Sequence, residues 1–391
     1  MEVGPGREVQ GALGVESRKE PGRGIIRSNR CRKGLHEPGV IFAKSEVIYD
    51  VSVITTFVKH DLAMSAVVGR RKEILQMNHS IVTSFFLLGF QDLHHFKIPF
   101  FTFLLVIYMF TICGNLLIIL LILRSHLIHS PMYFFLCHLS LCDLLFTTNI
   151  MPNMLQVILR EGSRISFIGC FTQFYIFGSC TGFECYLLTV MSFDRYLAIC
   201  NPLRYISIMV TSRCWHLVIY SWMLGFLLVL ITLILLCRLE FCDLDIIDHF
   251  YCDLAPIMEL SCSDTFDVEM ETLVLTNFIV PLPFMFVLAT YGCIFYTILG
   301  ISSRTGRQKT FSTCSSHLAV VCSYYGSLIS IYLSPSGGHR LNLNKILSLL
   351  YTVVTPMFNP IIYSLRNQEI RKAFISVFKL NCEVVSDCLL E

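Results

Sequence analysis

The chain alternates between long stretches without a charged side chain and short segments in which charges gather. Seven such stretches, each at least 20 residues long, follow residue 97. They cover residues 98–123, 125–159, 165–193, 214–237, 272–303, 310–338 and 346–365, and contain only Asp143 and Glu184 as charged residues. About 20 apolar residues let a helix cross a bilayer. The pattern predicts membrane helices at about 98–124, 131–159, 166–198, 214–237, 272–300, 310–334 and 344–365.

Other fold classes fit this pattern poorly. A membrane barrel would show segments of about ten alternating residues, and a soluble bundle would carry charges along one face of each helix. The 391 residues are 54% hydrophobic and 15% charged, with a mean hydropathy of +0.64, whereas soluble chains are about 25% charged. The net charge of +2 argues against nucleic acid as a partner. We therefore predict an all-α membrane protein, a seven-helix bundle in contact with the lipid bilayer.

The basic residues near the helix ends predict the orientation. Eleven Lys and Arg fall on the side that holds the C-terminus and six on the other side. Because basic residues stay in the cytoplasm, we expect an extracellular N-terminus and a cytoplasmic C-terminus in a multi-pass plasma membrane protein. The segment 240–271 has ten acidic residues and no Lys or Arg, which suits an outer loop.

The first 76 residues differ from the remainder of the chain. They carry a net charge of +4, against −2 for the other 315 residues, and show no sustained periodicity. Met77 directly precedes Asn78, which begins a glycosylation acceptor triplet on the predicted outer side. We interpret 1–76 as a poorly structured N-terminal extension, the alternative being a regulatory tail. The receptor unit is then 77–380, followed by a cytoplasmic tail at 381–391.

Five sequence motifs occur in order at or near the ends of the predicted helices. They are Gly114-Asn115, SPMYFFLCHLSLCDLL at 130–145, MSFDRYLAICNPLRY at 191–205, KTFSTCSSHLAVV at 309–321 and TPMFNPIIYSLRN at 355–367. Together they resemble the olfactory receptors, a branch of the rhodopsin-like G-protein-coupled receptors, from residue 77 to about 380. The chain departs from the family pattern at Ser192-Phe193, where Ala-Tyr is usual, and at Thr290, where Ser is usual.

We interpret Asn115, Asp143, Glu184 and Asn359, which lie within predicted helices, as four interior polar positions. Ionisable groups in a bilayer normally face the bundle interior. The resemblance implies one water-filled cluster, which could hold a sodium ion near Asp143 and Glu184; no other cofactor is expected. The alternative is a set of polar contacts that join helices, and the two interpretations are compatible.

The resemblance also implies a switch at the cytoplasmic end of the third helix. Asp194 would restrain Arg195 at rest, and activation would release Arg195 toward a G protein. Two prolines kink the seventh helix, which allows a change of packing. The full predicted set is Asp194, Arg195, Tyr196, Tyr291, His317, Asn359, Pro360 and Tyr363.

After the seventh helix the pattern becomes amphipathic. Apolar residues recur at three- and four-residue spacing over 367–380, with basic residues on the other face. Such a pattern is typical of a helix that lies on the membrane surface. We expect an interfacial helix over about 367–380.

Eighteen cysteines are present, and most fall inside the predicted helices, where they pack as small apolar residues. Only Cys170, Cys242, Cys252 and Cys262 lie at the predicted outer face, and the sequence allows three pairings. The resemblance implies Cys170–Cys252 and Cys242–Cys262. The run His249 to Asp253 could alternatively bind a metal, but a disulfide-bonded Cys252 could not be a ligand, and we expect no metal.

The chain shows no phosphate loop, no His-Glu-x-x-His and no nucleophile elbow, so we expect a receptor and no enzyme. The resemblance places ligand-binding residues in the outer half of the bundle: Phe177, Gly178, Thr181, Gly182, Leu275, Ile279, Tyr325, Leu328, Tyr332 and Thr352. These positions are mainly apolar, with hydroxyls and no formal charge, although each taken singly could be core packing. A receptor that binds an amine would need a carboxylate at the position of Phe177 to pair with the charge of its ligand.

The sequence therefore predicts a receptor for a small, neutral, mostly apolar odorant. The resemblance implies a heterotrimeric stimulatory G protein as partner and cAMP as the signal. Two alternatives remain: a non-olfactory G-protein-coupled receptor of the same fold and a membrane transporter. Transporters usually show an internal repeat, and the seven segments show none.

Overall fold

A computed structural model describes residues 82–90, 93–125, 127–242, 245–332, 341–366 and 369–375. All of them belong to one compact unit that starts at Val67. The predictions for 1–76, for Asn78 and for the tail at 381–391 concern residues outside these ranges.

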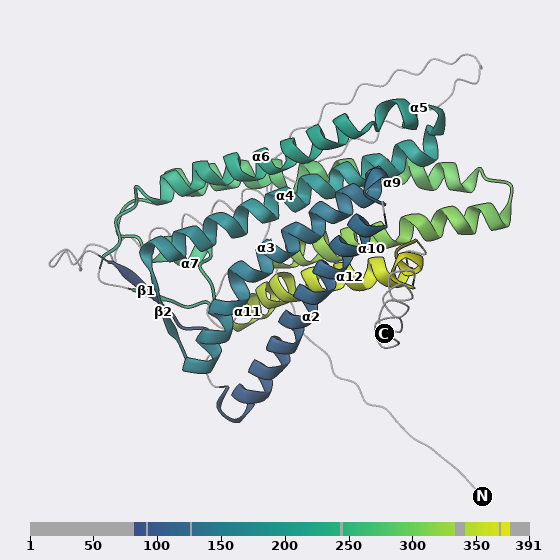
Figure 1. Cartoon of the computed structure of the whole chain (residues 1–391). Helices are drawn as coiled ribbons and strands as arrows, with labels where there is room; N and C mark the ends of the chain where they lie inside the picture. Colours follow the sequence, from purple (N-terminus) through teal and green to yellow (C-terminus); the bar gives the residue numbers. More distant parts are fainter. Residues whose placement is uncertain are drawn as a thin grey trace, which may run out of the picture. The chain divides into compact units, whose positions relative to one another are not determined.

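The predicted seven-helix fold is confirmed (Figure 1). The long helices are α2 (Lys97–Arg124), α3 (Pro131–Arg160), α4 (Phe167–Cys200), α6 (Thr211–Leu236), α8 (Phe266–Ile279) with α9 (Pro281–Leu299), α10 (Arg304–Tyr332), and α11 (Leu341–Leu349) with α12 (Thr355–Arg366). Shorter helices are η1 (His94–Phe96), η2 (Leu127–His129), α5 (Pro202–Ile208) and α7 (Leu254–Glu259). Residues 369–375 are helical, within the predicted interfacial helix.

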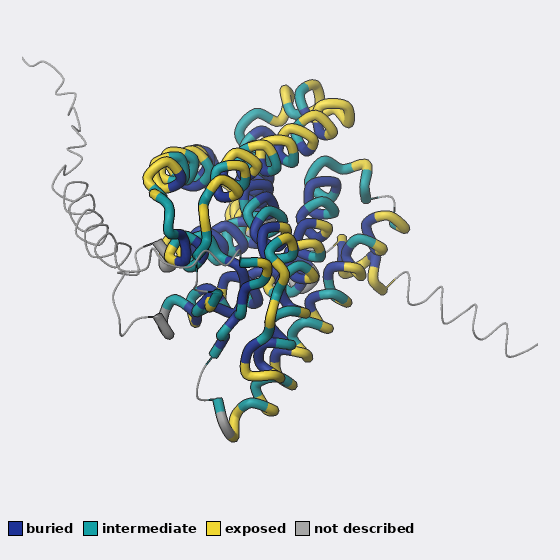
Figure 2. Tube along the Cα trace, turned by 90° about the vertical axis from the view of Figure 1, so that its left-hand side faces the viewer, coloured by how far each residue is buried: buried dark blue, intermediate teal, exposed yellow. Residues whose placement is uncertain are grey.

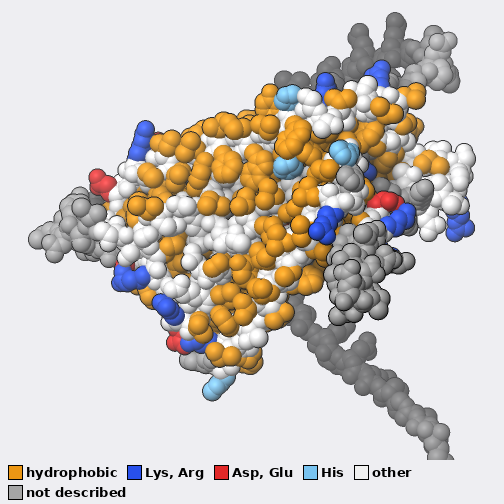
Figure 3. Space-filling model, viewed as in Figure 1, with side chains coloured by type: hydrophobic (Ala, Val, Ile, Leu, Met, Phe, Trp, Pro, Cys, Tyr) orange, Lys and Arg blue, Asp and Glu red, His pale blue; other side chains and the backbone are white. Residues whose placement is uncertain are grey.

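The outer surface of the bundle is apolar. Figure 3 shows hydrophobic side chains over its flank, with Lys and Arg gathered toward the ends, and Figure 2 shows the exposed residues on the outward sides of the helices. Six spans in the described ranges are long and apolar enough to cross a membrane, and α10 is not among them. Its lower apolarity arises from polar residues such as Ser316 and His317, which are buried and so face other helices.

Helix α4 is the centre of the bundle and contacts α3, α6 and α9. It approaches α6 closely because glycines face each other at the contact. A Cβ atom on Gly182 would lie 3.2 Å from Gly225 Cα, and one on Gly225 would lie 2.6 Å from the Ser179 carbonyl oxygen. One turn further, Phe183 stacks on Trp222 with 3.8 Å between ring centroids.

The main differences from the predicted helices occur in three of them. The predicted helix 272–300 is divided at Val280, since Pro281 has no N–H to donate and occupies the first position of α9. Helix α10 begins at Arg304, six residues before its predicted start. Ser303, the residue before the helix, caps its first turn, because its Oγ accepts a hydrogen bond of 3.2 Å from Gly306 N–H. The last helix contains a π-helical turn, η4 (Leu350–Val354), between α11 and α12.

A small sheet, which the sequence did not predict, lies at the end of the bundle where α2 begins. It has the order β2-β1-β3, with β1 (Ser84–Leu87) antiparallel to β2 (Ser163–Ser166) and parallel to β3 (Ile246–Ile247). Strands this short show too few residues for an alternating pattern. The sheet fastens the segment before α2 to the loops before α4 and between α6 and α8.

Candidate functional site

The long loop between α6 and α8, here called the lid, is held by two disulfides. Cys170 pairs with Cys252 and Cys242 with Cys262, with Cα–Cα distances of 5.5 and 5.9 Å, so both implied pairings are confirmed. Cys252 N–H also donates to Gln173 Oε1 at 3.0 Å. Since its sulfur is bonded to Cys170, Cys252 is not free to bind a metal, and no metal-binding group of three or more His, Cys, Asp or Glu occurs in the described ranges.

A buried lysine joins the lid to helix α11 and to the sheet. Lys345 is 2% exposed, and its Nζ donates to Asp248 Oδ1 at 2.6 Å and to the Gly89 carbonyl oxygen at 2.9 Å. A buried cation needs such partners to offset its lost hydration. Burial, followed by the charge of Lys345, lowers the pKa of His249 to about 3. In the sequence analysis Lys345 is only one of the six basic residues on the predicted outer side.

Beneath the lid, aromatic rings surround a group of hydroxyls. The Phe177 ring lies 5.0 Å from that of Tyr251 on the lid and 5.3 Å from that of Phe146. Thr181 Oγ1 lies 2.8 Å from the hydroxyl of Tyr351, and the Tyr324 hydroxyl donates to the Thr181 carbonyl oxygen at 2.7 Å. We call these six residues the aromatic–hydroxyl cluster.

The cluster contains two predicted residues, Phe177 and Thr181, and four that the sequence interpretation missed. Tyr351 and Tyr324 are direct neighbours of the predicted Thr352 and Tyr325 along their helices. Phe146 and Tyr251 lie on α3 and on the lid, and no spacing within a single helix connects them to the others.

The other predicted ligand residues take several places. Tyr325 is buried against Phe284, with its hydroxyl donating to the Cys185 carbonyl oxygen at 3.4 Å. Thr352 Oγ1 donates to the carbonyl oxygen of its own helix at Ser348. The remaining residues are Leu328, which is buried, Ile279 and Leu275, which are half-buried, Gly178 and Gly182, which lie against α6, and Tyr332, whose side chain is outside the description. Their contacts with a ligand stay predictions.

The interior polar residues are buried, and two of them are joined directly. Asn359 Nδ2 donates to both oxygens of Asp143, at 3.1 and 2.9 Å, and Glu184 is 4% exposed. Asn115 Nδ2 donates to the carbonyl oxygen of Pro356 at 3.3 Å, in α12, the helix that also carries Asn359. The same pair of acids offers the oxygen ligands that a sodium ion needs, and sodium binding stays a prediction.

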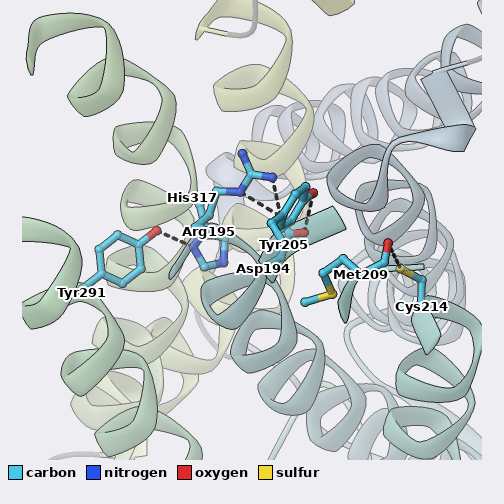
Figure 4. A network of polar contacts seen from close by, with 7 residues as sticks. All are labelled: Asp194, Arg195, Tyr205, Met209, Cys214, Tyr291 and His317. Atoms are coloured by element: carbon cyan, nitrogen blue, oxygen red, sulfur yellow. Dashed lines mark hydrogen bonds and ion pairs between the residues drawn. The ribbon is translucent and has the colours of Figure 1, made fainter. Parts of the chain in front are cut away.

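The opposite end of the bundle carries a second polar network (Figure 4). The buried Asp194 carboxylate accepts hydrogen bonds from the Arg195 guanidinium, with Nε at 2.9 Å, and from the Tyr205 hydroxyl at 3.0 Å. The Arg195 side chain is 13% exposed. Burial, followed by the charge of Asp194, raises the pKa of Tyr205, so this hydroxyl remains a donor. Asp194 therefore binds Arg195 within its own helix.

The other predicted switch residues lie around this network. The Tyr291 hydroxyl is 2.6 Å from His317 Nδ1, which joins α9 to α10. The Tyr196 hydroxyl accepts from Asn201 Nδ2 at 3.3 Å. Tyr363 is fully buried, and its hydroxyl has no partner in the described part of the chain. Pro360 abuts Gly114 of α2, where a Cβ atom would lie 3.0 Å away.

Residues 104–381 match the family model described as olfactory receptor. The chain belongs to the olfactory receptor family. It is 44% identical to human olfactory receptor 11A1 over 301 residues, which is 77% of this chain and 95% of that protein. It is also 44% identical to human olfactory receptor 11L1, covering 79% and 96% of the two chains, and 43% identical to mouse olfactory receptor 5G29, covering 76% and 95%.

Members of this family are G-protein-coupled receptors for odorants, located in the plasma membrane with several membrane spans, and they are not enzymes. The expectation of a receptor is confirmed, and the transporter alternative is not supported. The aromatic–hydroxyl cluster and the Asp194–Arg195 network are thus the candidate ligand and coupling sites of an olfactory receptor.

Proposed function

We propose that this olfactory receptor binds a small, neutral, mostly apolar odorant beneath the lid and activates a stimulatory G protein, which raises cAMP. The N-terminus is extracellular in this proposal, and the end of the bundle with Arg195 is cytoplasmic. The aromatic–hydroxyl cluster is the observation that carries the ligand class.

The groups in this cluster are rings and neutral hydroxyls. Rings favour an apolar ligand, and the Thr181–Tyr351 pair can hydrogen-bond one polar group of that ligand. The nearest acid along α4 is Glu184, which is 4% exposed and is not part of the cluster. A cationic ligand would therefore find no free carboxylate among the residues of the cluster.

Activation follows from a difference in affinity between two states of the bundle. A ligand shifts the equilibrium only as far as it prefers the active state. Here the resting state is the one in which Asp194 holds Arg195. In the active state α10 moves outward and Arg195 turns into the opening, where the G protein docks. The Tyr291–His317 contact joins α10 to α9 and must adapt to this movement.

The charge distribution supports the orientation. By sequence, eleven basic residues, Arg195 among them, fall on one side of the predicted helices, and the lid is acidic, as expected for cytoplasmic and outer sides. An epitope tag inserted before residue 77 tests this directly. Antibody binding to intact cells is the expected result, and binding only after permeabilisation would contradict the proposed orientation.

A cAMP reporter assay with a panel of small odorants tests the function, using both the full chain and a chain that starts at Met77. We expect a response to neutral odorants that disappears in cells lacking the stimulatory α-subunit. Arg195→Ala should abolish the response while surface expression, measured on the same cells, is unchanged. Normal signalling from this variant, or a response that persists without the stimulatory α-subunit, would refute the coupling proposal.

A further inference from the structure

A groove opens between α2, α12 and the helical residues 369–375. It has a volume of about 460 Å³, within the range of about 300–1,000 Å³ that small-molecule sites occupy. It lies at the end of the bundle opposite the sheet, since α2 runs from the sheet toward Leu121, which lines it. Apart from Arg371, the residues that line the groove are apolar.

The walls of the groove face outward from the bundle. Its floor contains Ile118 and Ile370, which are buried, and its rim contains Leu117 and Phe374, which are 40% and 38% exposed. These rim residues lie on the flank of a bundle that spans a membrane, so their surroundings are acyl chains and not water. A hydrocarbon chain is therefore the occupant that fits the apolar part.

The charge at the groove specifies the occupant further. The neighbouring Lys372 is paired with Glu369, with 2.8 Å between Nζ and Oε1. Arg371 has no acidic partner within ion-pair distance in the described ranges. A guanidinium that has no acidic partner among the described residues, beside an apolar groove at the membrane surface, complements a lipid with a negatively charged headgroup.

We propose that this groove binds one anionic phospholipid, with an acyl chain between α2 and residues 369–375 and the headgroup phosphate on Arg371. A second copy of the receptor suits the groove less well, because its apolar flank would cover Arg371 without supplying a negative charge. The bound lipid bridges the first helix and the segment after the seventh, and so holds that segment against the bundle. The proposal is independent of which odorant binds.

Photolabelling of the purified full chain in nanodiscs tests the proposal. The probes are phosphatidylserine and phosphatidylcholine that carry the same photoreactive diazirine in one acyl chain, and the labelled peptides are identified by mass spectrometry. We expect phosphatidylserine to label α2 near Leu117 and the 369–375 segment more strongly than phosphatidylcholine does. Arg371→Gln should lower phosphatidylserine labelling about fivefold, as expected for the loss of one cation at an anionic lipid.

Lys372→Gln is the matched control, because it removes an adjacent cation that does not line the groove. It should leave the labelling unchanged. Leu117→Trp should reduce labelling by both lipids, since the larger side chain narrows the groove. Arg371→Lys should retain most of the phosphatidylserine labelling. The thermal unfolding temperature of each variant shows whether it folds like the native receptor.

Several results would overturn the proposal. Equal losses in Arg371→Gln and Lys372→Gln would indicate a diffuse attraction to the charged surface. Equal labelling by the two lipids would show that Arg371 does not select a negatively charged headgroup. Undiminished labelling in Leu117→Trp would show that the lipid binds outside this groove. A cross-link between two receptors through α2, in place of lipid labelling, would assign the groove to a second copy.

Discussion

Lys345 Nζ, at the start of the seventh helix, lies 2.6 Å from Asp248 Oδ1 on the lid. The same ammonium group donates to the carbonyl oxygen of Gly89, so three segments that are distant in the sequence meet at one cation. Gly89 has a φ of +69° and lies against Val157, where a Cβ atom would be 2.4 Å from Cγ1, which explains why a glycine occurs shortly after β1. The lid is therefore fastened by Lys345 as well as by its disulfides.

Removing Asp248 should cost more stability than removing Lys345. Asp248→Asn leaves a buried cation without its counter-charge, and we expect a loss of about 3–5 kcal/mol. Lys345→Met removes the cation itself and leaves a carboxylate that is 39% exposed and can be hydrated, so we expect about 1–3 kcal/mol. Thermal unfolding followed by a dye that reacts with buried thiols measures both. The reverse order would show that Lys345 is not the buried charge of this contact.

Mild acid should destabilise the lid through His249. Its pKa is 6.5 in the unfolded chain and about 3 in the fold, so between these values only the unfolded state binds the proton. Stability should fall by up to about 1.4 kcal/mol for each pH unit below 6.5. Native receptor and His249→Phe are compared by thermal unfolding at about pH 7.5 and about pH 5.5, and the variant should lose less stability on acidification.

Some acids on the lid change the stability with pH in the opposite direction to His249. The result that tests the prediction is therefore the difference in acid-induced stability loss between the native receptor and His249→Phe. Burial raises the pKa of Asp253 and of Glu259, and such acids contribute stability at low pH that is lost as pH rises. Both are unchanged in His249→Phe. Identical pH dependence in the two proteins would show that His249 is protonated in the folded receptor.

The sequence predicts the helices well because membrane spans are signalled by composition. Stretches such as 98–123 contain no charge, and no soluble helix of that length would avoid one. The sheet was missed because β3 is two residues long and forms only through partners far along the chain. Tyr351 lies in the π turn η4, which alters the residues that face inward and has no signal in the sequence.

Weakening the hold of Asp194 on Arg195 should raise signalling without odorant. Asp194→Asn removes the charge that binds the guanidinium, whereas Tyr205→Phe removes one hydrogen bond to the same carboxylate. We expect basal cAMP to rise several-fold in the first variant and less in the second. The measurement is ligand-free reporter output divided by surface expression. Ser207→Ala, on the exposed side of α5, is the control, and unchanged basal output in Asp194→Asn would argue against the resting restraint.

The contact between α4 and α6 should depend on Gly225. A methyl group at this position would lie 2.6 Å from the Ser179 carbonyl oxygen, and we expect Gly225→Ala to cost about 1–3 kcal/mol because backbone must shift. Gly292→Ala is the matched control, because nothing lies within 4 Å of its Cβ position. The thermal unfolding temperature should fall only in the first variant, and a fall of equal size in both would point to helix flexibility as the cause.

The Thr181–Tyr351 hydroxyl pair should distinguish odorants that carry a hydrogen-bonding group from hydrocarbons of similar size. Tyr351→Phe and Thr181→Val each remove one hydroxyl of a pair 2.8 Å apart, and we expect a rise of about fivefold to tenfold in the half-maximal concentration of a polar odorant, as for loss of one hydrogen bond of about 1 kcal/mol. Thr148→Val, whose hydroxyl bonds only to its own helix on an exposed side, is the control. Because the two hydroxyls contact each other, the double variant should cost less than the sum of the single changes.

Two results would contradict this prediction. Additive losses would mean that the odorant contacts the two residues independently, and an equal effect on hydrocarbons would show that the variants alter packing and not recognition.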